Sequence, residues 1–527
     1  MGRPIGGSAP IRFAAFGGAL MATIPGTFGP DNLVGTADDD VFYSQTGDDT
    51  IFAGAGNDTI WAALGNGVIN LGTGADTAKL SDGNQYVSAA DDTGPGALGD
   101  IIVTGAGSDT ILAGGGDNYI NVGNGDDLVS WVDGAGGTIL AGGGTDTLDL
   151  SRATTGREIY GEAGGIAGSN VYFNGFESIV ATNLNDTVWG APATIDGAGG
   201  NDVIYGGAGT TLMVGGTGDD LLISNSAAAT ILGGSGADTI FGAGSDSIDG
   251  GDGNNVIRGS DFASTLIGGV DADTIIGGTG AETIDGGSGS NYLNGGAGAN
   301  VFKVGLGNDV VAASGTSNTL DFSNAASGAS IFSYGGATGS GFSVGFNPGA
   351  VNHYIGSSSA DTFVNFYSGL LEGGAGLDTL DNSGAATAQT VDLTQPVSPA
   401  FALNLVSIEG VKTGIGNDTI IGNDDGNQLD AGAGNDQITG GAGDDTIIGG
   451  IGNDDLAGGE GANTFVFAGS FGTDTISDFK VGVDKLAFSG ITSTQVTFTA
   501  DGEVSFGTNN ITILADGDLS ISDFIFS

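Results

Sequence analysis

The chain has 527 residues, of which 107 are Gly, 62 are Asp or Glu and only 10 are Lys or Arg, so its formal charge is −52. This charge excludes nucleic acid as a partner, because binding to phosphate requires clustered Lys and Arg. The lack of Cys excludes a disulfide framework and a Cys-based zinc site. No run of apolar residues reaches the length of about 20 that a transmembrane helix needs.

Residues 1–30 precede the regular part of the sequence. They contain a mildly apolar run from Phe13 to Ile24 that Gly17 and Gly18 dilute. A Sec-type signal also needs a small-residue cleavage site, and none stands out here. We therefore expect residues 1–30 to form an N-terminal extension.

From residue 31 a nine-residue phrase recurs, Gly-Gly-x-Gly-x-Asp-x-(large apolar)-x. Clear copies occupy residues 53–61, 440–448 and 449–457. Glycines permit a tight turn over six residues, and the last three residues form a short strand with its central side chain inward. A copy cannot bury a core alone, so copies must stack, with two copies of 18 residues per coil. The sequence predicts an all-β fold, a parallel β-helix or β-roll solenoid.

The repeat is interrupted in several places, which divides the chain. We expect a solenoid over 31–312 with longer rungs at about 80–103 and 150–196, irregular β-rungs over 313–412, and a β-roll over 413–466. Two interruptions begin with similar phrases, Asp146–Ser151 and Asp378–Ser383. Both lead into segments rich in Thr, Val and Ile, which favours longer rungs over inserted domains.

The sixth-position Asp of each copy is a candidate calcium ligand. Ca²⁺ takes six to eight oxygens from carboxylates and backbone carbonyls, and stacked glycine turns supply carbonyls. Turns on the same edge of the solenoid are separated by 18 residues, so a site needs Asp at i and i+18. The candidate ligands are Asp40, Asp49, Asp58, Asp76, Asp109, Asp127, Asp146, Asp202, Asp220, Asp238, Asp273, Asp309, Asp378, Asp418, Asp436, Asp445 and Asp454.

The candidate ligands are unevenly distributed between the two edges. The column of Asp202, Asp220 and Asp238 faces Thr211 and Ala229 on the other edge. We expect calcium along one edge of each block, with Asn, Thr and Ser side chains hydrogen-bonding the turn backbone on the other. Tolerated loss of Asp is an alternative explanation for the uneven edges.

The nonapeptide resembles the calcium-binding repeat of RTX ("repeats in toxin") proteins. Residues 467–527 depart from the repeat. The stretch Gly472–Phe479 resembles the segment that closes the β-roll of serralysin-like secreted proteins, and the end, Ile521–Ser527, is similar to uncleaved type I secretion signals. The resemblance implies bound Ca²⁺, export by type I secretion machinery as an unfolded chain, folding on calcium outside the cell, and a C-terminal cap at 467–527.

Catalytic signatures are weak. The single histidine, His353, cannot form the paired His-Glu-x-x-His zinc site, and we expect it to be a surface or rung residue without a nucleophile elbow beside it. The basic pair Arg152 and Arg157 is better explained by salt bridges than by lyase chemistry. Ice binding would need a regular Thr array, which is not present.

We therefore expect a secreted, non-enzymatic structural protein, such as a surface-layer or matrix subunit that associates with itself or with cell-surface polysaccharide. The alternative is a monomeric calcium-binding adhesin or host-interaction factor.

Overall fold

A computed structural model describes residues 21–89, 98–190, 192–315, 317–395, 397, 402–499 and 502–527. It divides into two compact units, Met1–Val270 and Asp271–Ser527, hereafter unit 1 and unit 2. The predicted all-β class is confirmed, since the described residues contain one short 3₁₀ turn, η1 (Ile521–Asp523), and otherwise strands. No described helix is long and apolar enough to cross a membrane.

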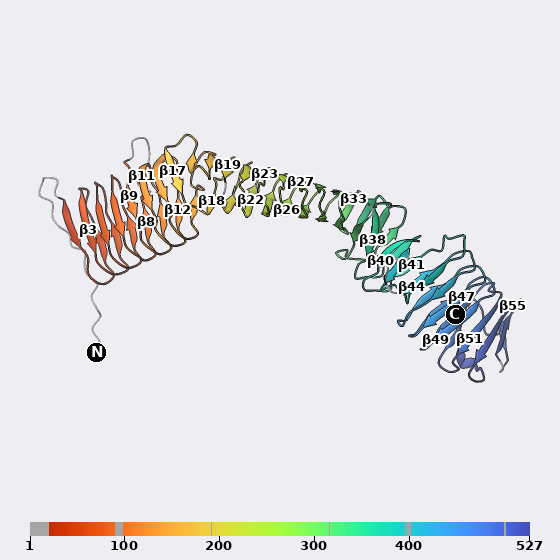
Figure 1. Ribbon diagram of the computed structural model, residues 1–527. Helices are drawn as coiled ribbons and strands as arrows, with labels where there is room; N and C mark the ends of the chain where they lie inside the picture. The colour runs from red at the N-terminus through yellow and green to blue at the C-terminus, as the bar shows by residue number, and fades with distance from the viewer. Residues whose placement is uncertain are drawn as a thin grey trace, which may run out of the picture. The chain divides into compact units, whose positions relative to one another are not determined.

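Unit 1 contains two parallel sheets, and the chain alternates between them rung by rung (Figure 1). The first sheet contains β1 (Ala22–Pro25), β3 (Asp40–Ser44), β5 (Thr59–Ala62), β7 (Thr77–Leu80), β9 (Ile101–Val103), β11 (Gly116–Asn121), β13 (Ala135–Leu140), β15 (Glu158–Tyr160), β16 (Gly165–Ile166), β17 (Val171–Asn174), β19 (Thr187–Gly190), β21 (Val203–Gly206), β23 (Leu221–Ile223), β25 (Thr239–Phe241) and β27 (Val256–Arg258). The second contains β2 (Asn32–Val34), β4 (Thr50–Phe52), β6 (Val68–Asn70), β8 (Tyr86–Ser88), β10 (Thr110–Leu112), β12 (Leu128–Ser130), β14 (Thr147–Asp149), β18 (Ser178–Val180), β20 (Thr194–Asp196), β22 (Leu212–Thr217), β24 (Thr230–Ser235), β26 (Ser247–Asp252) and β28 (Thr265–Val270).

Unit 2 has the same design with a third sheet toward its C-terminus. Its first sheet contains β29 (Thr274–Ile276), β31 (Tyr292–Gly296), β33 (Gly307–Ala313), β35 (Ser330–Phe332), β36 (Gly336–Gly339), β37 (Phe342–Phe346), β39 (Thr362–Val364), β41 (Thr379–Asp381), β44 (Gly410–Lys412), β46 (Gln428–Asp430), β48 (Thr446–Ile448), β50 (Thr464–Ala468), β52 (Lys485–Ser489) and β56 (Phe524–Phe526). Its second contains β30 (Thr283–Asp285), β32 (Val301–Lys303), β34 (Asn318–Asp321), β38 (Val351–Ile355), β40 (Gly369–Glu372) and β43 (Leu403–Val406). Its third contains β42 (Thr390–Asp392), β45 (Thr419–Ile421), β47 (Gln437–Gly441), β49 (Asp455–Gly459), β51 (Thr473–Phe479), β53 (Thr497–Phe498), β54 (Glu503–Phe506) and β55 (Asn509–Ala515).

The strand register follows the 18-residue period. Strands β3 and β5 pair in parallel with Phe42 opposite Ile60, and β46 pairs with β48 with Leu429 opposite Ile447. These central residues are at most 1% exposed, so each rung contributes one inward apolar side chain to a continuous core. Stacking of coils therefore buries what a single copy cannot.

Three departures from the regular coil begin with the same kind of turn. The runs beginning at Asp149, Asp321 and Asp381 each have the form Asp-x-Ser-x-Ala, and in each the Ser N–H donates to Asp Oδ1 at 2.8–3.0 Å. After the first two corners the chain adds a hairpin to the sheet, β15–β16–β17 and β35–β36–β37. The chain at these interruptions thus stays within the sheets as extended rungs, and the corner at Asp321, the second of the three, was not recognised from the sequence.

Both ends of the described solenoid extend beyond the predicted repeat boundaries. Strand β1 already pairs with β3, so the first rung begins inside the segment assigned to the 1–30 extension, whose residues 1–20 lie outside the described part of the chain. At the other end β50, β52 and β56 pair in parallel. The segment 467–527 therefore continues the sheets of unit 2 rather than only covering them.

Candidate metal sites in the glycine turns

The sixth-position side chains form a hydrogen-bonded column along each edge. The Asp40 N–H donates to Asp58 Oδ1, and the Asp58 N–H donates to Asp76 Oδ1, both at 2.7 Å. In unit 2 the Asp418 N–H donates to Asp436 Oδ1 at 2.7 Å. The i, i+18 spacing therefore corresponds to direct contact between coils, and each Asp uses one oxygen to bind the preceding coil.

The candidate ligands lie in two such columns in each unit. Each column takes the name of the sheet to which the following strands belong. The first-sheet column of unit 1 contains Asp40, Asp58, Asp76, Asp202, Asp220 and Asp238, and the second-sheet column contains Asp49, Asp109, Asp127 and Asp146. In unit 2 the first-sheet column contains Asp273, Asp309, Asp378 and Asp445, and the third-sheet column contains Asp418, Asp436 and Asp454.

The second carboxylate oxygen of many of these residues has no protein partner. It is buried and without a hydrogen bond in Asp58, Asp127, Asp146, Asp202, Asp220, Asp238, Asp378, Asp418, Asp436, Asp445 and Asp454. Burial of an unpaired charge costs free energy, so buried charges in proteins are usually paired with an opposite charge or coordinate a metal. This oxygen is therefore available to a cation.

The turn glycines bring backbone carbonyls to the same place. A Cβ placed on Gly215 would lie 2.5 Å from both Asp220 Oδ2 and Gly233 O, and one on Gly233 would lie 2.4 Å from both Asp238 Oδ2 and Gly250 O. A carboxylate oxygen and a carbonyl of the next coil thus converge where a side chain would otherwise stand. No group of three or more His, Cys, Asp and Glu side chains suited to a metal occurs among the described residues. The donor set, carboxylate plus carbonyl, fits Ca²⁺.

Burial shifts the titration of these carboxylates. Desolvation, reinforced by the charges of Asp220 and Asp186, raises the pKa of Asp202 to about 8. Desolvation, with repulsion from Asp454 and Asp418, raises the pKa of Asp436 to about 7. Like charges repeated along a buried column raise the cost of ionisation, and a bound cation would remove that cost.

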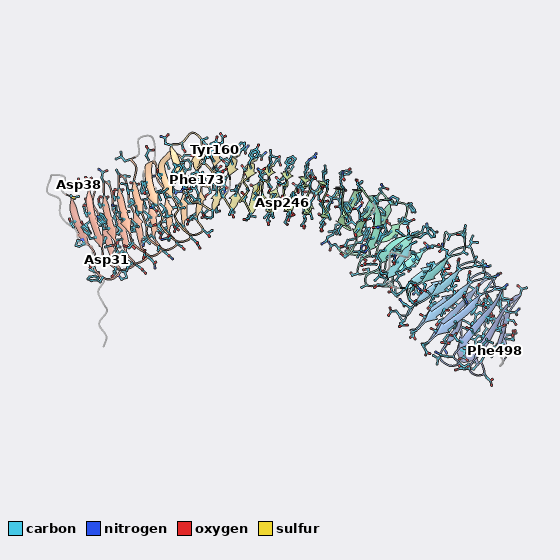
Figure 2. The ribbon with its side chains drawn as sticks, in the orientation of Figure 1. Asp31, Asp38, Tyr160, Phe173, Asp246 and Phe498 are labelled. Carbon is cyan, nitrogen blue, oxygen red and sulfur yellow. The ribbon has the colours of Figure 1, made fainter. Side chains whose placement is uncertain are left out.

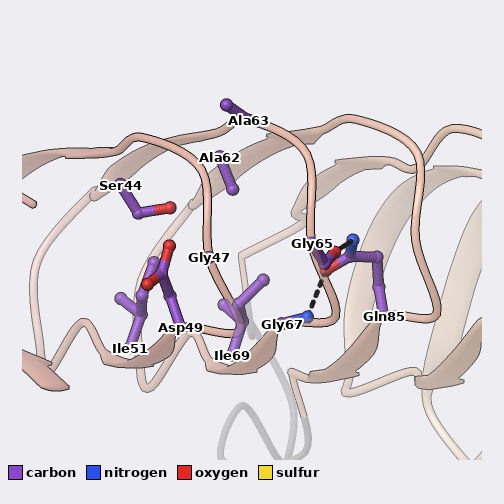
Figure 3. Close-up of a pocket in the computed structure, with 10 residues that line it drawn as sticks. All are labelled: Ser44, Gly47, Asp49, Ile51, Ala62, Ala63, Gly65, Gly67, Ile69 and Gln85. Atoms are coloured by element: carbon purple, nitrogen blue, oxygen red, sulfur yellow. Dashed lines mark hydrogen bonds between the residues drawn. The ribbon is translucent and has the colours of Figure 1, made fainter. Parts of the chain in front are cut away.

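Amide side chains occupy the same position where Asp is absent. The Asn118 Oδ1 accepts the Asp100 N–H at 2.8 Å, while Asn118 Nδ2 donates to Gly114 O at 3.2 Å. Figure 3 shows the equivalent Gln85, whose Oε1 accepts the Gly67 N–H at 2.9 Å and whose Nε2 donates to Gly65 O at 2.7 Å. The amide N–H group lies against turn carbonyls, as expected for the edge poor in carboxylate. A neutral donor thus takes the place that a cation would take elsewhere.

A third kind of turn satisfies its carboxylate with a hydroxyl residue. The Thr182 N–H and Oγ1 both donate to Asp186 Oδ2, at 2.8 and 2.7 Å. Thr36 makes the same two bonds to Asp40 Oδ2, at 2.6 and 3.0 Å, and Ser357 makes them to Asp361. Among the candidate ligands, Asp40 therefore differs from Asp58 in that its second oxygen already has protein donors.

Several column members were not predicted. Asp100 follows Asp76 by 24 residues, and Glu177 and Glu409 follow Asp146 and Asp378 by 31 residues. Because these coils are longer than 18 residues, the i, i+18 test passes over them. A second ladder was also missed, in which fifth-position side chains accept from the next coil: the Ala75 N–H donates to Asn57 Oδ1 at 2.8 Å. Its signal is the recurrent Asn or Asp directly before the sixth position.

His353 has two polar partners on the outer face of unit 2. Its Nε2 lies 2.9 Å from Glu372 Oε1, and its Nδ1 lies 3.1 Å from Thr319 Oγ1. The three residues lie on the adjacent parallel strands β34, β38 and β40, as expected for a rung residue. This order of hydroxyl, imidazole and carboxylate is that of a hydrolytic triad, but such chemistry also needs free N–H donors for an oxyanion. The Thr319 N–H is already bonded to Asn300 O at 2.8 Å.

One Gly-x-Ser-x-Gly run does occur, at Gly341–Gly345, contrary to the expectation that none accompanies His353. Its Ser343 is the second residue of strand β37 and donates to Asn308 Oδ1 at 2.9 Å. A nucleophile elbow requires a sharp strand-to-helix turn. The run is therefore part of a hairpin strand.

Comparison with known proteins supports the calcium chemistry. The family model for the RTX calcium-binding nonapeptide repeat matches residues 25–60, 43–78, 96–129, 194–222, 214–257, 249–281, 276–311, 411–438 and 431–465. No curated protein matches the sequence. Among solved structures, the extracellular lipase LipA from Serratia marcescens is 17% identical over 52% of this chain and 40% of the lipase chain, with a TM-score of 0.18. The chain therefore contains RTX calcium-binding nonapeptide repeats in multiple copies, in both of its units.

Proposed function

We propose that the protein is an extracellular, non-enzymatic structural protein, a surface-layer or matrix subunit that folds and assembles when it binds calcium outside the cell. The observation that carries the proposal is the column of buried Asp oxygens without partners in both units. Repulsion among the carboxylates keeps such a chain unfolded until a cation binds, so binding and folding become one event. Extracellular modules bind calcium at about 10⁻⁴ to 10⁻³ M, well above cytosolic levels.

The candidate ligands named above are part of this proposal. Replacing Asp418, Asp436 and Asp454 together by Ala removes three adjacent carboxylates from one column of unit 2. We expect calcium-induced β-structure, followed by far-ultraviolet circular dichroism, to lose cooperativity in this variant. An unchanged calcium titration would contradict the ligand assignment.

Assembly is tested separately from calcium binding. The protein is purified in millimolar calcium, examined for sheets or fibres by electron microscopy, and examined again after addition of chelator. We expect ordered assemblies with calcium and none after its removal. A protein that folds on calcium but stays monomeric at all concentrations would overturn the lattice role and retain the calcium role.

A secreted adhesin is the second candidate, and an aromatic surface on unit 1 favours it. Tyr160, Trp189 and Tyr205 follow one another on the outer face of the first sheet, and Figure 2 labels Tyr160. The rings of Trp189 and Tyr205 stack with centroids 4.0 Å apart, beside a surface hollow of 310 Å³ that Glu162 and Asn225 also line. Exposed aromatic rings with polar neighbours suit binding of a neutral glycan.

The adhesin hypothesis is tested by binding of the calcium-loaded protein to neutral polysaccharides. Trp189→Ala should abolish binding, whereas Trp61→Ala, at an exposed position on the same sheet, should leave it unchanged. Equal binding by both variants would rule out this surface.

A further inference from the structure

Two carboxylate pairs lie outside the segments that the repeat model matches and have the same construction. In unit 1 the Asp146 N–H donates to Glu177 Oε2 at 2.9 Å, and in unit 2 the Asp378 N–H donates to Glu409 Oε2 at 3.0 Å. In both pairs the Asp carbonyl accepts from the Glu N–H and from the N–H that follows it. The strands that follow the Asp and the Glu pair in parallel in the same register in both units, β14 with β18 and β41 with β44.

Each Asp in these pairs has one oxygen that no protein group satisfies. Oδ1 accepts from the preceding coil, from the Asp127 N–H at 2.9 Å in unit 1 and from the Asp361 N–H at 2.7 Å in unit 2. Oδ2 of Asp146 and of Asp378 is buried without a hydrogen bond, and both side chains are 0% exposed. An uncompensated buried carboxylate oxygen beside a second carboxylate indicates a missing positive charge.

A backbone carbonyl also faces the pair in unit 2. A Cβ placed on Gly373 would lie 2.1 Å from Ser407 O and 2.4 Å from Asp378 Oδ2, so glycine is needed to leave this space open. Ser407 has a φ of +49°, which a non-glycine residue rarely adopts, and it stands two residues before Glu409. In unit 1 the equivalent residues are Ala141 and Gly175, and Gly175 also has a positive φ, of +91°.

The electrostatics of the pairs agree with this geometry. Desolvation, together with the negative charges of Asp361 and Glu409, raises the pKa of Asp378 to about 6. Desolvation and the charge of Glu177 also raise the pKa of Asp146. A cation beside Asp378 or Asp146 would favour the ionised form of that Asp.

We propose that the Asp378–Glu409 pair, with Ser407 O, and the Asp146–Glu177 pair each hold one divalent cation, with Ca²⁺ the ion that the all-oxygen donors suit. These sites combine a repeat Asp with a Glu from the strand that returns after an extended rung. They fasten the extended rungs to the regular coils, which the nonapeptide alone does not do. The inference rests on calcium binding by the chain and is independent of its assembly.

Native mass spectrometry of the full chain at saturating calcium tests the proposal by counting bound ions. Gln in place of Glu keeps an oxygen for the Asp N–H but removes the charge. We expect Glu409→Gln and Glu177→Gln each to bind one ion fewer than the wild-type protein, and the double variant to bind two fewer. The control is Glu162→Gln at an exposed position, which should keep the full count. Equal counts in all variants would overturn the proposal.

A second measurement needs no variant. In crystals of the wild-type protein grown with calcium, anomalous density should lie about 2.3–2.6 Å from Asp378 Oδ2. Ions in the nonapeptide turns with none at Asp378 would overturn this inference and leave the general calcium role intact. A wild-type protein without any bound calcium would instead refute the calcium chemistry proposed for the whole chain.

Discussion

At the scale of single residues, the sixth position of the repeat has two separable tasks. One side-chain oxygen accepts the N–H of the preceding coil, and both Asp and Asn can do this, as Asp127 and Asn118 show. The second atom differs, since Asp presents an oxygen to the turn and Asn presents an N–H donor. Asp therefore leaves an oxygen that needs a cation or a hydrogen-bond donor, whereas Asn needs only carbonyls.

Substitution at Asp436 separates the two tasks. Asp436→Asn retains the oxygen that accepts the Asp418 N–H, whereas Asp436→Ala removes both interactions. We expect the Asn variant to lose the ion bound at residue 436 yet stay folded at saturating calcium. The Ala variant should be about 1–3 kcal/mol less stable than the Asn variant, because the buried Asp418 N–H is left unpaired. Calcium titration and urea unfolding, both followed by circular dichroism, measure the two effects. If the two variants are equally stable, the ladder hydrogen bond does not contribute.

At the scale of the turn, a hydroxyl residue can replace the cation as well. Thr182 gives two donors to Asp186 Oδ2, and both residues are buried. The turn is therefore complete without metal, in contrast to the turn of Asp202 one coil later, whose Oδ2 is unpaired. Such turns stand where the repeat resumes after an interruption, at Asp186 and at Asp361.

We predict that Thr182→Val lowers the free energy of unfolding by about 1–3 kcal/mol, because Asp186 loses one of its donors in a buried site. The change should be the same at two calcium concentrations at which the protein is folded, since no ion is assigned to this turn. Urea unfolding in both conditions measures it. Thr230→Val, at an exposed strand position, is the control and should leave the midpoint unchanged. A loss of stability that differs between the two calcium concentrations would contradict the hydroxyl-capped turn.

The extent to which the sequence predicted these elements depends on the period. Regular coils were predicted well, because Gly spacing fixes the turn and the central apolar residue fixes the strand, as for Ile60 and Ile447. The hydrogen bonds from Asp76 to Asp100 and from Asp146 to Glu177 were not predicted, because extended rungs break the 18-residue spacing. Hydroxyl capping of Asp40 was also missed, because a Thr at the second turn position gives no periodic signal.

At the scale of the whole molecule, acidic side chains greatly outnumber basic ones. Ten Lys and Arg residues cannot neutralise 62 acidic ones, so few ion pairs are available. The described residues include Lys480 with Glu460 at 3.1 Å on the surface and Arg157 with Asp133. Neutralisation of the columns must therefore come from cations or from protons.

Protons should replace calcium in part, so the stability of the calcium-free protein should depend on pH. The pKa of Asp202 is raised to about 8 and that of Asp436 to about 7 in the folded chain, mainly by burial, against an ordinary value of 3.8. The folded state without calcium therefore holds more protons than the unfolded state, and its stability falls as the pH rises from about 4 to about 8. We expect calcium-free protein to keep more β-structure at pH 5 than at pH 8.

Calcium should remove this difference, because the bound ion stabilises the ionised carboxylates. Circular dichroism of dialysed protein across pH 5–8, with and without added calcium, measures both effects. High salt screens repulsion among exposed charges but not the cost of burial, so the pH dependence should persist in 1 M NaCl. The variant Asp202→Asn, which cannot ionise, should show a weaker dependence than the wild-type protein. Calcium-free protein with equal or greater β-structure at pH 8 would show that the buried columns do not control folding.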